Sequence, residues 1–201
     1  MKSWVGLMVL GLALCSFGKS NVARMVDIAY IERFAPLAIK EMHRVGIPAS
    51  IKLAQAVIES NAGRSTLAAN SNNHFGIKCK SYWTGLSYYH KDDDLDIKGK
   101  LIESCFRAYQ DIEASFKDHS DFLKTSPKYL SLFALDAMDY RSWANGLKAC
   151  GYATDKSYAA KLIQTIEEYH LYRYDTFQSP VFDLPVHIPT MTTSPRETTI
   201  D

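Results

Sequence analysis

One glutamate, Glu59, ends an otherwise apolar segment that carries helix signals at both ends. Pro48 suits the first turn of a helix, and Gly63 suits the residue just past its end. Apolar residues recur between them at helical spacing, which predicts a buried face: Ile51, Ala54 and Ile58. A carboxylic acid half enclosed by hydrocarbon resists ionising, so it can donate a proton near neutral pH, as acid catalysis of glycoside cleavage requires. The alternative is a solvent-facing glutamate at a helix end.

The elements that must position Glu59 are mostly helical. Periodic apolar residues predict further helices over 26–44, 111–124, 128–135 and 140–149, and a last helix capped by Thr154 or Asp155. The helical period disappears over 77–109, where short aromatic pieces bracket the polar run KDDDLDIKGK and predict a β-hairpin with a long tip. The sequence therefore predicts a mainly α domain with a small β-hairpin lobe, whose shared cleft suits an extended polymer.

Length and composition narrow the choice of function. The chain has 201 residues, enough for one well-packed domain, and a formal net charge of +1. This near-neutral charge gives no electrostatic case for binding nucleic acid or an anionic membrane surface. The sequence has no C-x-x-C pair and no His-rich spacing, so we expect neither a structural metal nor a cofactor.

The N-terminus has the features of a secretory signal over residues 1–20. Lys2 precedes an apolar run from Trp4 to Leu14, which has the length of a signal core rather than of a membrane span. Cleavage near Ser16–Ser20 is one outcome, and a lipid anchor on Cys15, at the end of LALC, is the other. Either outcome predicts export to the periplasm, the outer membrane or the exterior. The segment 176–201 is rich in Pro, Thr and Ser and predicts a disordered tail.

Export leaves three cysteines in an oxidising compartment. Cys79 and Cys105 flank the loop-rich stretch, and a disulfide between them would close it. Cys150 lies in KACGYA, where we expect a buried free thiol.

Four sequence blocks, in this order along the chain, resemble glycoside hydrolase family 73. They are LAQAVIESNAGRS, NNHFGIK with Trp83 shortly after it, FRAYQDIEASFKDHSDFL and LKACGYATDKSYAAKLIQTIEEYHL. The resemblance implies a lysozyme-like glucosaminidase domain over 26–175 that hydrolyses the bond after N-acetylglucosamine in peptidoglycan glycan strands. We expect it to act as a monomer.

The same resemblance suggests roles for individual residues. The family's general acid matches Glu59, and the tyrosine of its G-Y-A-T-D block, which lines the cleavage subsite, matches Tyr152. Its cleft-lining loop matches four further residues: Asn73, Phe75, Gly76 and Trp83. His74 and Tyr109 complete the substrate-binding candidates. His119 lies on the apolar face of its helix, where it either orients a site group or belongs to the core; Trp143 is expected in the core.

The second catalytic group stays open at this stage. Many members of the family place a glutamate on the hairpin, whereas this chain has Asp92, Asp93 and Asp94 there. In an inverting route one of these aspartates activates a water molecule; in a substrate-assisted route the sugar's own N-acetyl carbonyl attacks C1. The alternative without a catalytic role is that the acidic run is only a solvated turn.

Other functions also remain open. A lytic transglycosylase or muramidase would share the fold and the single helix-end glutamate. A non-catalytic wall-binding module would retain the fold alone, and host N-glycan cores offer the same linkage chemistry.

Overall fold

The helix that carries Glu59, α2 (Ala49–Ser60), is the central helix of the molecule in this computed structural model. The structure describes residues 8–95 and 97–176, with the side chains of 8–20, 92 and 93 outside the description. The start of the predicted signal, the Cys15 side chain and all of the predicted tail 176–201 beyond its first residue therefore lie outside the described residues. In the described part of the chain, no helix is both long enough and apolar enough to cross a membrane.

Burial of α2 extends well beyond the single predicted face. The helix packs against α1 (Met8–Val45), α5 (Tyr140–Ala149), α6 (Tyr158–Glu168) and the 3-10 turn η2 (Leu171–Tyr174). Every residue from Ala49 to Val57 is buried, including the polar ones. The exposed fraction rises only at Ile58 and Glu59, in the last turn. The helix therefore holds its own catalytic candidate at the edge of the core.

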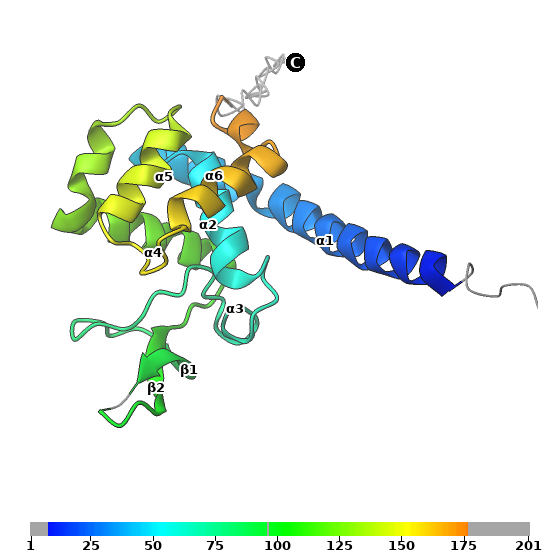
Figure 1. Cartoon of the computed structure of the whole chain (residues 1–201). Helices are drawn as coiled ribbons and strands as arrows, with labels where there is room; N and C mark the ends of the chain where they lie inside the picture. Colours follow the sequence, from blue (N-terminus) through cyan, green and yellow to red (C-terminus); the bar gives the residue numbers. More distant parts are fainter. Residues whose placement is uncertain (1–7, 96, 177–201) are drawn as a thin grey trace, which may run out of the picture.

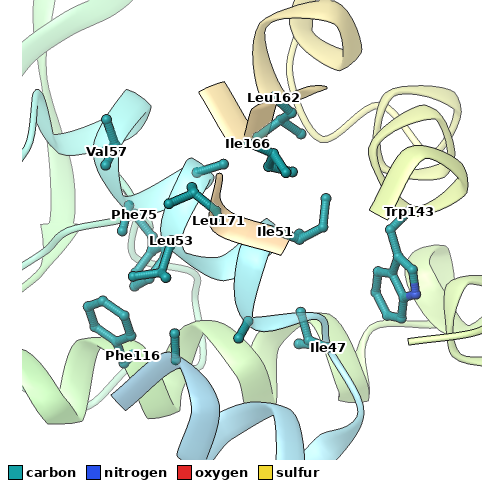
Figure 2. Close-up of a cluster of buried hydrophobic side chains, with 14 of the residues drawn as sticks. Ile47, Ile51, Leu53, Val57, Phe75, Phe116, Trp143, Leu162, Ile166 and Leu171 are labelled. Carbon is teal, nitrogen blue, oxygen red and sulfur yellow. The ribbon is translucent and has the colours of Figure 1, made fainter. Parts of the chain in front are cut away.

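Core side chains from several helices meet around α2 (Figure 2). In this view Leu53 lies on the side of Phe116 of α4 (Ile112–Thr125), and Ile51 lies on the side of Ile166 of α6. Trp143 is fully buried, as predicted. Burying a large apolar side chain is worth about 1.5–3 kcal/mol, so this cluster is the main force that fixes α2 in place.

The N-terminus of α2 is capped from the far end of the described chain. Pro48 stands at the N-cap position and offers no side-chain hydrogen bond. Instead, the buried carboxylate of Asp175 accepts from the Ser50 backbone N–H at 2.8 Å and from its hydroxyl at 2.6 Å, across 125 residues. A carboxylate at a helix N-terminus satisfies unpaired N–H groups and complements the helix dipole.

Most other helices match their predicted ranges. Asp111 caps α4 by accepting from the Ala114 N–H, and Asp139 caps α5 by accepting from the Ser142 N–H. The 3-10 helix η1 (Pro127–Ala134) occupies the short predicted helix near 128–135. The predicted helix over 26–44 is the second half of α1, which is longer than expected. The short α3 (Thr66–Ser71) was not predicted.

Two caps differ from the prediction. Asn61 and Ala62 adopt left-handed backbone at the end of α2, two and one residues before Gly63, so the helix ends earlier than expected. At the start of α6, Ser157 rather than Thr154 or Asp155 holds the cap position. Asp155 instead accepts from the Ser157 N–H and hydroxyl, which organises the turn before the helix.

The predicted β lobe is a two-stranded antiparallel sheet of β1 (Ser87–Leu95) and β2 (Leu101–Arg107), which extends below the helical body in Figure 1. The register pairs Ser87 with Arg107 and Lys91 with Glu103, then shifts before Leu95 pairs with Leu101. The three aspartates lie in this irregular part of β1 rather than at the hairpin tip. The mainly α fold with a small hairpin lobe is thus confirmed.

Candidate active site

A cleft of about 430 Å³ lies where the end of α2 meets the base of the β lobe. Glu59 lines it from α2, and Tyr152 from the loop after α5. Phe75 and Gly76 line it from the loop after α3, and Lys78 from the segment that leads to the hairpin. Glu59 is the only carboxylate in the lining as far as described side chains go. The predicted proton donor therefore faces an open groove.

Glu59 is half-buried and held by a buried tyrosine. The hydroxyl of Tyr158 donates to Oε1 of Glu59 at 2.8 Å and accepts from Nε2 of Gln55 at 3.1 Å. Burial raises the pKa of Tyr158 far above its usual range, so this hydroxyl keeps its proton and remains a donor. The carboxyl group is thus fixed in position by a chain of two hydrogen bonds that begins one helical turn earlier on α2.

Tyr152 lies beside this pair. Gly151 ends α5 with a positive φ of 67°, and the Tyr152 N–H then bonds back to the Leu147 carbonyl at 3.0 Å. This turn stacks the Tyr152 ring on Tyr158, with ring centroids 5.5 Å apart. Burial, followed by the nearby Glu59 carboxylate, raises the pKa of Tyr152, so its hydroxyl also stays protonated.

Two residues of the predicted cleft loop belong to the floor of the cleft. The Phe75 ring stacks on His119 with centroids 4.0 Å apart and lines the cleft. Gly76 has a φ of 64° and nothing within 4 Å of the position a Cβ would take. A glycine is needed here for the backbone conformation, and it leaves the groove open above Phe75.

The other two loop candidates, Asn73 and His74, do not line the cleft, which corrects the prediction. Asn73 is 1% exposed, and its amide bonds to the backbone of Ile77 and Arg107, which leaves nothing to present to a ligand. His74 is buried beside Tyr30, whose hydroxyl lies 2.6 Å from its Nδ1. Burial lowers the pKa of His74 to about 4. Both residues shape the loop from below.

Trp83 and Tyr109 likewise stand outside the described cleft lining and belong to a cluster around Arg107. The guanidinium of Arg107 lies 4.5 Å from the centre of the Trp83 ring. Its Nη1 forms an ion pair with Asp118, 2.9 and 2.8 Å from the two carboxylate oxygens. The Tyr109 hydroxyl donates to the same Asp118 at 2.7 Å. These contacts stabilise the base of the β lobe.

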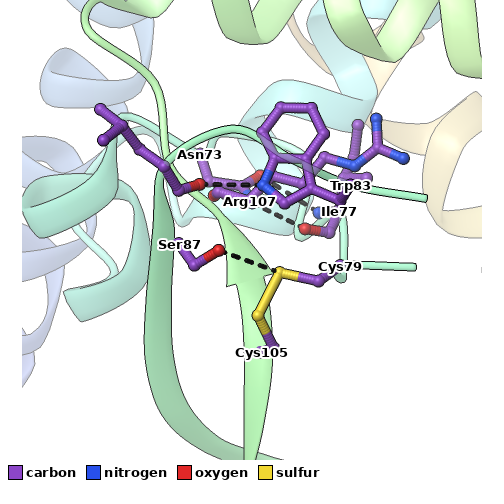
Figure 3. Close-up of a disulfide and its surroundings, with 8 residues drawn as sticks. Asn73, Ile77, Cys79, Trp83, Ser87, Cys105 and Arg107 are labelled. Carbon is purple, nitrogen blue, oxygen red and sulfur yellow. Dashed lines mark hydrogen bonds between the residues drawn. A yellow bond between two sulfur atoms is a disulfide. The ribbon is translucent and has the colours of Figure 1, made fainter. Parts of the chain in front are cut away.

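A disulfide joins Cys79 and Cys105, whose Cα atoms are 5.3 Å apart (Figure 3). It ties the segment with the cleft residues Lys78 and Lys80 to β2. Figure 3 also places Trp83 and Arg107 next to this bridge. Cys150 is a free cysteine, half-buried rather than fully buried as expected.

Only one of the three candidate aspartates has a described side chain. Asp94 forms an ion pair with Lys78 at 2.6 Å and accepts from the Ser104 hydroxyl. The Lys78 ammonium, with the Ser104 hydroxyl, holds the pKa of Asp94 below its usual range. Asp92 and Asp93 lie in β1, but their side chains are outside the description. The candidate bases are therefore not brought to Glu59 by any described contact.

Three residues that hold the site were not predicted from the sequence. Tyr158 is separated from Glu59 by 99 positions, and no local pattern pairs the two. Lys52 carries a charge into a fully buried helix position, which contradicts the usual burial preference. Tyr129 belongs to the 3-10 helix η1, where it is buried and forms part of the cleft wall. His119, left open between core and site, is fully buried yet reaches Tyr152, with its Nε2 3.1 Å from the hydroxyl.

Comparison with known proteins gives a consistent result. The family model described as "Mannosyl-glycoprotein endo-beta-N-acetylglucosaminidase" matches residues 35–171, more than half of the chain. Over 163 residues the chain is 33% identical to the peptidoglycan hydrolase FlgJ of Pseudomonas aeruginosa, covering 78% of this chain and 40% of that protein. Over 132 residues it is 37% identical to the exo-glucosaminidase LytG of Bacillus subtilis, covering 63% and 45%.

Solved structures agree in fold. The catalytic domain of the autolysin Auto from Listeria monocytogenes is similar to this chain with a TM-score of 0.62 at 27% identity, covering 75% of this chain and 88% of that one. The chain spans less than half the length of the two curated relatives named above.

Proposed function

The chain belongs to the mannosyl-glycoprotein endo-beta-N-acetylglucosaminidase family, and we propose that it hydrolyses the β-1,4 bond after N-acetylglucosamine in peptidoglycan glycan strands. One observation carries the proposal: Glu59 ends the buried helix α2, faces the cleft and is held there by the Tyr158 hydroxyl at 2.8 Å. The names of the relatives, a peptidoglycan hydrolase and an exo-glucosaminidase, support the choice of substrate.

Glu59 is the general acid in this proposal. Its carboxyl proton passes to the glycosidic oxygen as the bond from that oxygen to C1 breaks, so the leaving sugar departs as a neutral alcohol. Tyr158 keeps the carboxyl group at the cleft edge through the transfer. A fixed donor contributes more than a mobile one because the entropy cost of orienting it is met on folding, before the reaction begins.

The substrate-assisted route suits the described residues better than the inverting one. Asp94 is already engaged by Lys78 and Ser104, and its lowered pKa makes it a weak base. In the substrate-assisted route the N-acetyl carbonyl oxygen forms the new bond to C1, which gives a cyclic oxazolinium ion. The Glu59 carboxylate then takes a proton from the water that opens this ring at C1. Both steps balance without a second protein carboxylate.

Tyr152 serves this route by orienting the acetamido group. Tyr152 belongs to the same cleft lining as Glu59, and its raised pKa keeps its hydroxyl protonated and able to donate a hydrogen bond. A donor that holds the carbonyl oxygen beneath C1 turns the attack into a well-oriented intramolecular step.

The substrate lies outside the cytoplasm, so we also propose export through the N-terminal segment. Cleavage within 16–20 and lipid attachment at Cys15 give mature proteins of different mass. The intact mass of protein recovered from cell envelopes, with Cys15→Ser as comparison, decides between them. An unprocessed chain in the cytoplasm would refute export.

Mass spectrometry of the fragments released from purified peptidoglycan tests the activity. New reducing ends on N-acetylglucosamine are the expected result. Reducing or anhydro ends on muramic acid would instead assign the enzyme to the muramidases or lytic transglycosylases, and intact strands would leave a wall-binding module.

A further inference from the structure

A lysine buried beneath the cleft, Lys52, makes all of its described polar contacts with α4. Its Nζ lies 3.3 Å from the Phe116 carbonyl oxygen, 2.7 Å from Nδ1 of His119 and 2.6 Å from Oγ of Ser120. The side chain is fully buried, so these groups stand in for water around the ammonium. An ammonium has three N–H donors and no acceptor, and three contacts meet that number.

The direction of each contact follows from its partners. The Ser120 hydroxyl has two acceptors for its hydrogen, the Phe116 carbonyl at 3.1 Å and the Glu41 carboxylate, and with either of them its oxygen accepts from Lys52. His119 faces the ammonium with Nδ1, which must accept as well. Burial, followed by the Lys52 charge, lowers the pKa of His119 well below its usual value, so the imidazole is neutral. A neutral ring that accepts at Nδ1 carries its proton on Nε2.

This proton decides what Tyr152 can do. Nε2 of His119 lies 3.1 Å from the Tyr152 hydroxyl oxygen and, as an N–H, donates to it. The hydroxyl hydrogen of Tyr152 is therefore directed away from His119. We propose that Lys52 and His119 are positioning residues that hold the Tyr152 hydroxyl as a hydrogen-bond donor toward the cleft. The catalytic consequence rests on the proposed function, in which this donor orients the acetamido group.

The chain of hydrogen bonds has two directions, and the charge of Lys52 selects one. A neutral Lys52 has two N–H groups, which serve Phe116 and Ser120, and its lone pair then faces Nδ1 of His119. Nδ1 becomes the donor, Nε2 accepts, and the Tyr152 hydroxyl turns toward the ring. Loss of the Lys52 proton therefore withdraws the donor from the cleft.

The surroundings place this reversal near neutral pH. Burial lowers the pKa of Lys52 to about 7, against the opposing attraction of Glu41. The other charged groups that act on it are Arg44, which lowers this pKa, and Asp121, which raises it. Glu41 and Arg44 of α1 are themselves paired at 2.6 Å, so neither is a free counter-ion for Lys52.

Nitrogen NMR of the His119 ring in the full chain tests the proposal without any substrate. We expect the proton on Nε2 well below pH 7 and on Nδ1 well above it, and no such exchange in Lys52→Met. A ring with its proton on Nδ1 at low pH, or the same titration in Lys52→Met, would overturn the proposal.

Kinetics with soluble glycan strands test the consequence. Removing one preorganised donor costs about 10²-fold in kcat, so Lys52→Met should approach this loss with KM little changed. His119→Gln should retain most activity, because its amide oxygen accepts from Lys52 and its NH₂ donates to Tyr152, whereas His119→Leu should not. Lys124→Met, an exposed lysine of α4, is the matched control.

A double mutant separates positioning from a general loss of stability. In the Tyr152→Phe background, Lys52→Met should cost nothing further in kcat, because the hydroxyl it positions is gone. Additive losses would refute the positioning role. If the NMR result holds but wild type cleaves no glycan, the proposed function fails and the inference stands; if wild type cleaves and Lys52→Met matches it, the inference fails.

Discussion

The Tyr158 hydroxyl donates to Oε1 of Glu59 at 2.8 Å, and this contact joins α6 to the last turn of α2. Tyr158→Phe removes the donor and leaves the ring in place. We expect kcat to fall about tenfold, the upper end of what losing one ordinary hydrogen bond costs, with the fold intact. Tyr169→Phe is the control, because its hydroxyl bonds to Asp27 at 2.9 Å, outside the described cleft lining. Equal activity of the two variants would show that Tyr158 does not hold Glu59 in its catalytic position.

The hairpin aspartates distinguish the two routes. Asp94→Asn should keep activity within about threefold, because the ion pair with Lys78 makes Asp94 part of the β lobe rather than a base. Asp92→Asn and Asp93→Asn should behave alike if the substrate supplies its own nucleophile. The first-formed anomer, observed by proton NMR, should be β, since two displacements at C1 retain configuration. A large loss at one aspartate together with an α product would establish the inverting route.

Asp175 should control the stability of α2. Asp175→Ala leaves the N-terminal N–H groups of α2 and the buried Ser50 hydroxyl without their partner. We expect a loss of about 1–2 kcal/mol in the free energy of unfolding, measured by urea titration. Asp136→Ala, an exposed turn residue, should cost much less. Equal losses in the two variants would show that the cap across 125 residues contributes nothing.

Stability should also depend on pH through Lys52. Burial lowers the folded-state pKa of Lys52 to about 7 from its usual 10.5, so the unfolded chain binds the extra proton between these values. Stability therefore rises with pH across this window, by up to about 1.4 kcal/mol per pH unit from this group, and the penalty is fully present below pH 7. The difference in unfolding free energy between wild type and Lys52→Met isolates the effect. A difference that is constant from pH 6 to pH 10 would contradict it.

Local signals were enough to predict most of the helical body. Pro48 and the apolar spacing after it indicate α2, and Asp111 indicates the start of α4 because each cap acts within one turn. The hairpin lobe follows from the loss of helical period. The bulge that holds the aspartates does not, because a register shift depends on cross-strand pairing.

The candidate site was predictable only in part, for a related reason. Glu59, Tyr152, Phe75 and Gly76 line the cleft, as the family likeness implied. Asn73 matches the same motif yet serves the backbone, since a motif does not reveal which way a side chain points. Contacts such as Lys52 with His119 join separate helices, and only the packed structure brings them together.

Turnover of peptidoglycan strands by Glu59→Gln tests the central claim most directly. The substitution keeps the size of the side chain and an oxygen for the Tyr158 hydroxyl, but it removes the acidic proton. We predict a loss of at least about 10³-fold in kcat with an unchanged melting temperature, while Glu32→Gln on the exposed side of α1 stays fully active. Wild-type turnover by Glu59→Gln would contradict the account, because the proton would then come from another group.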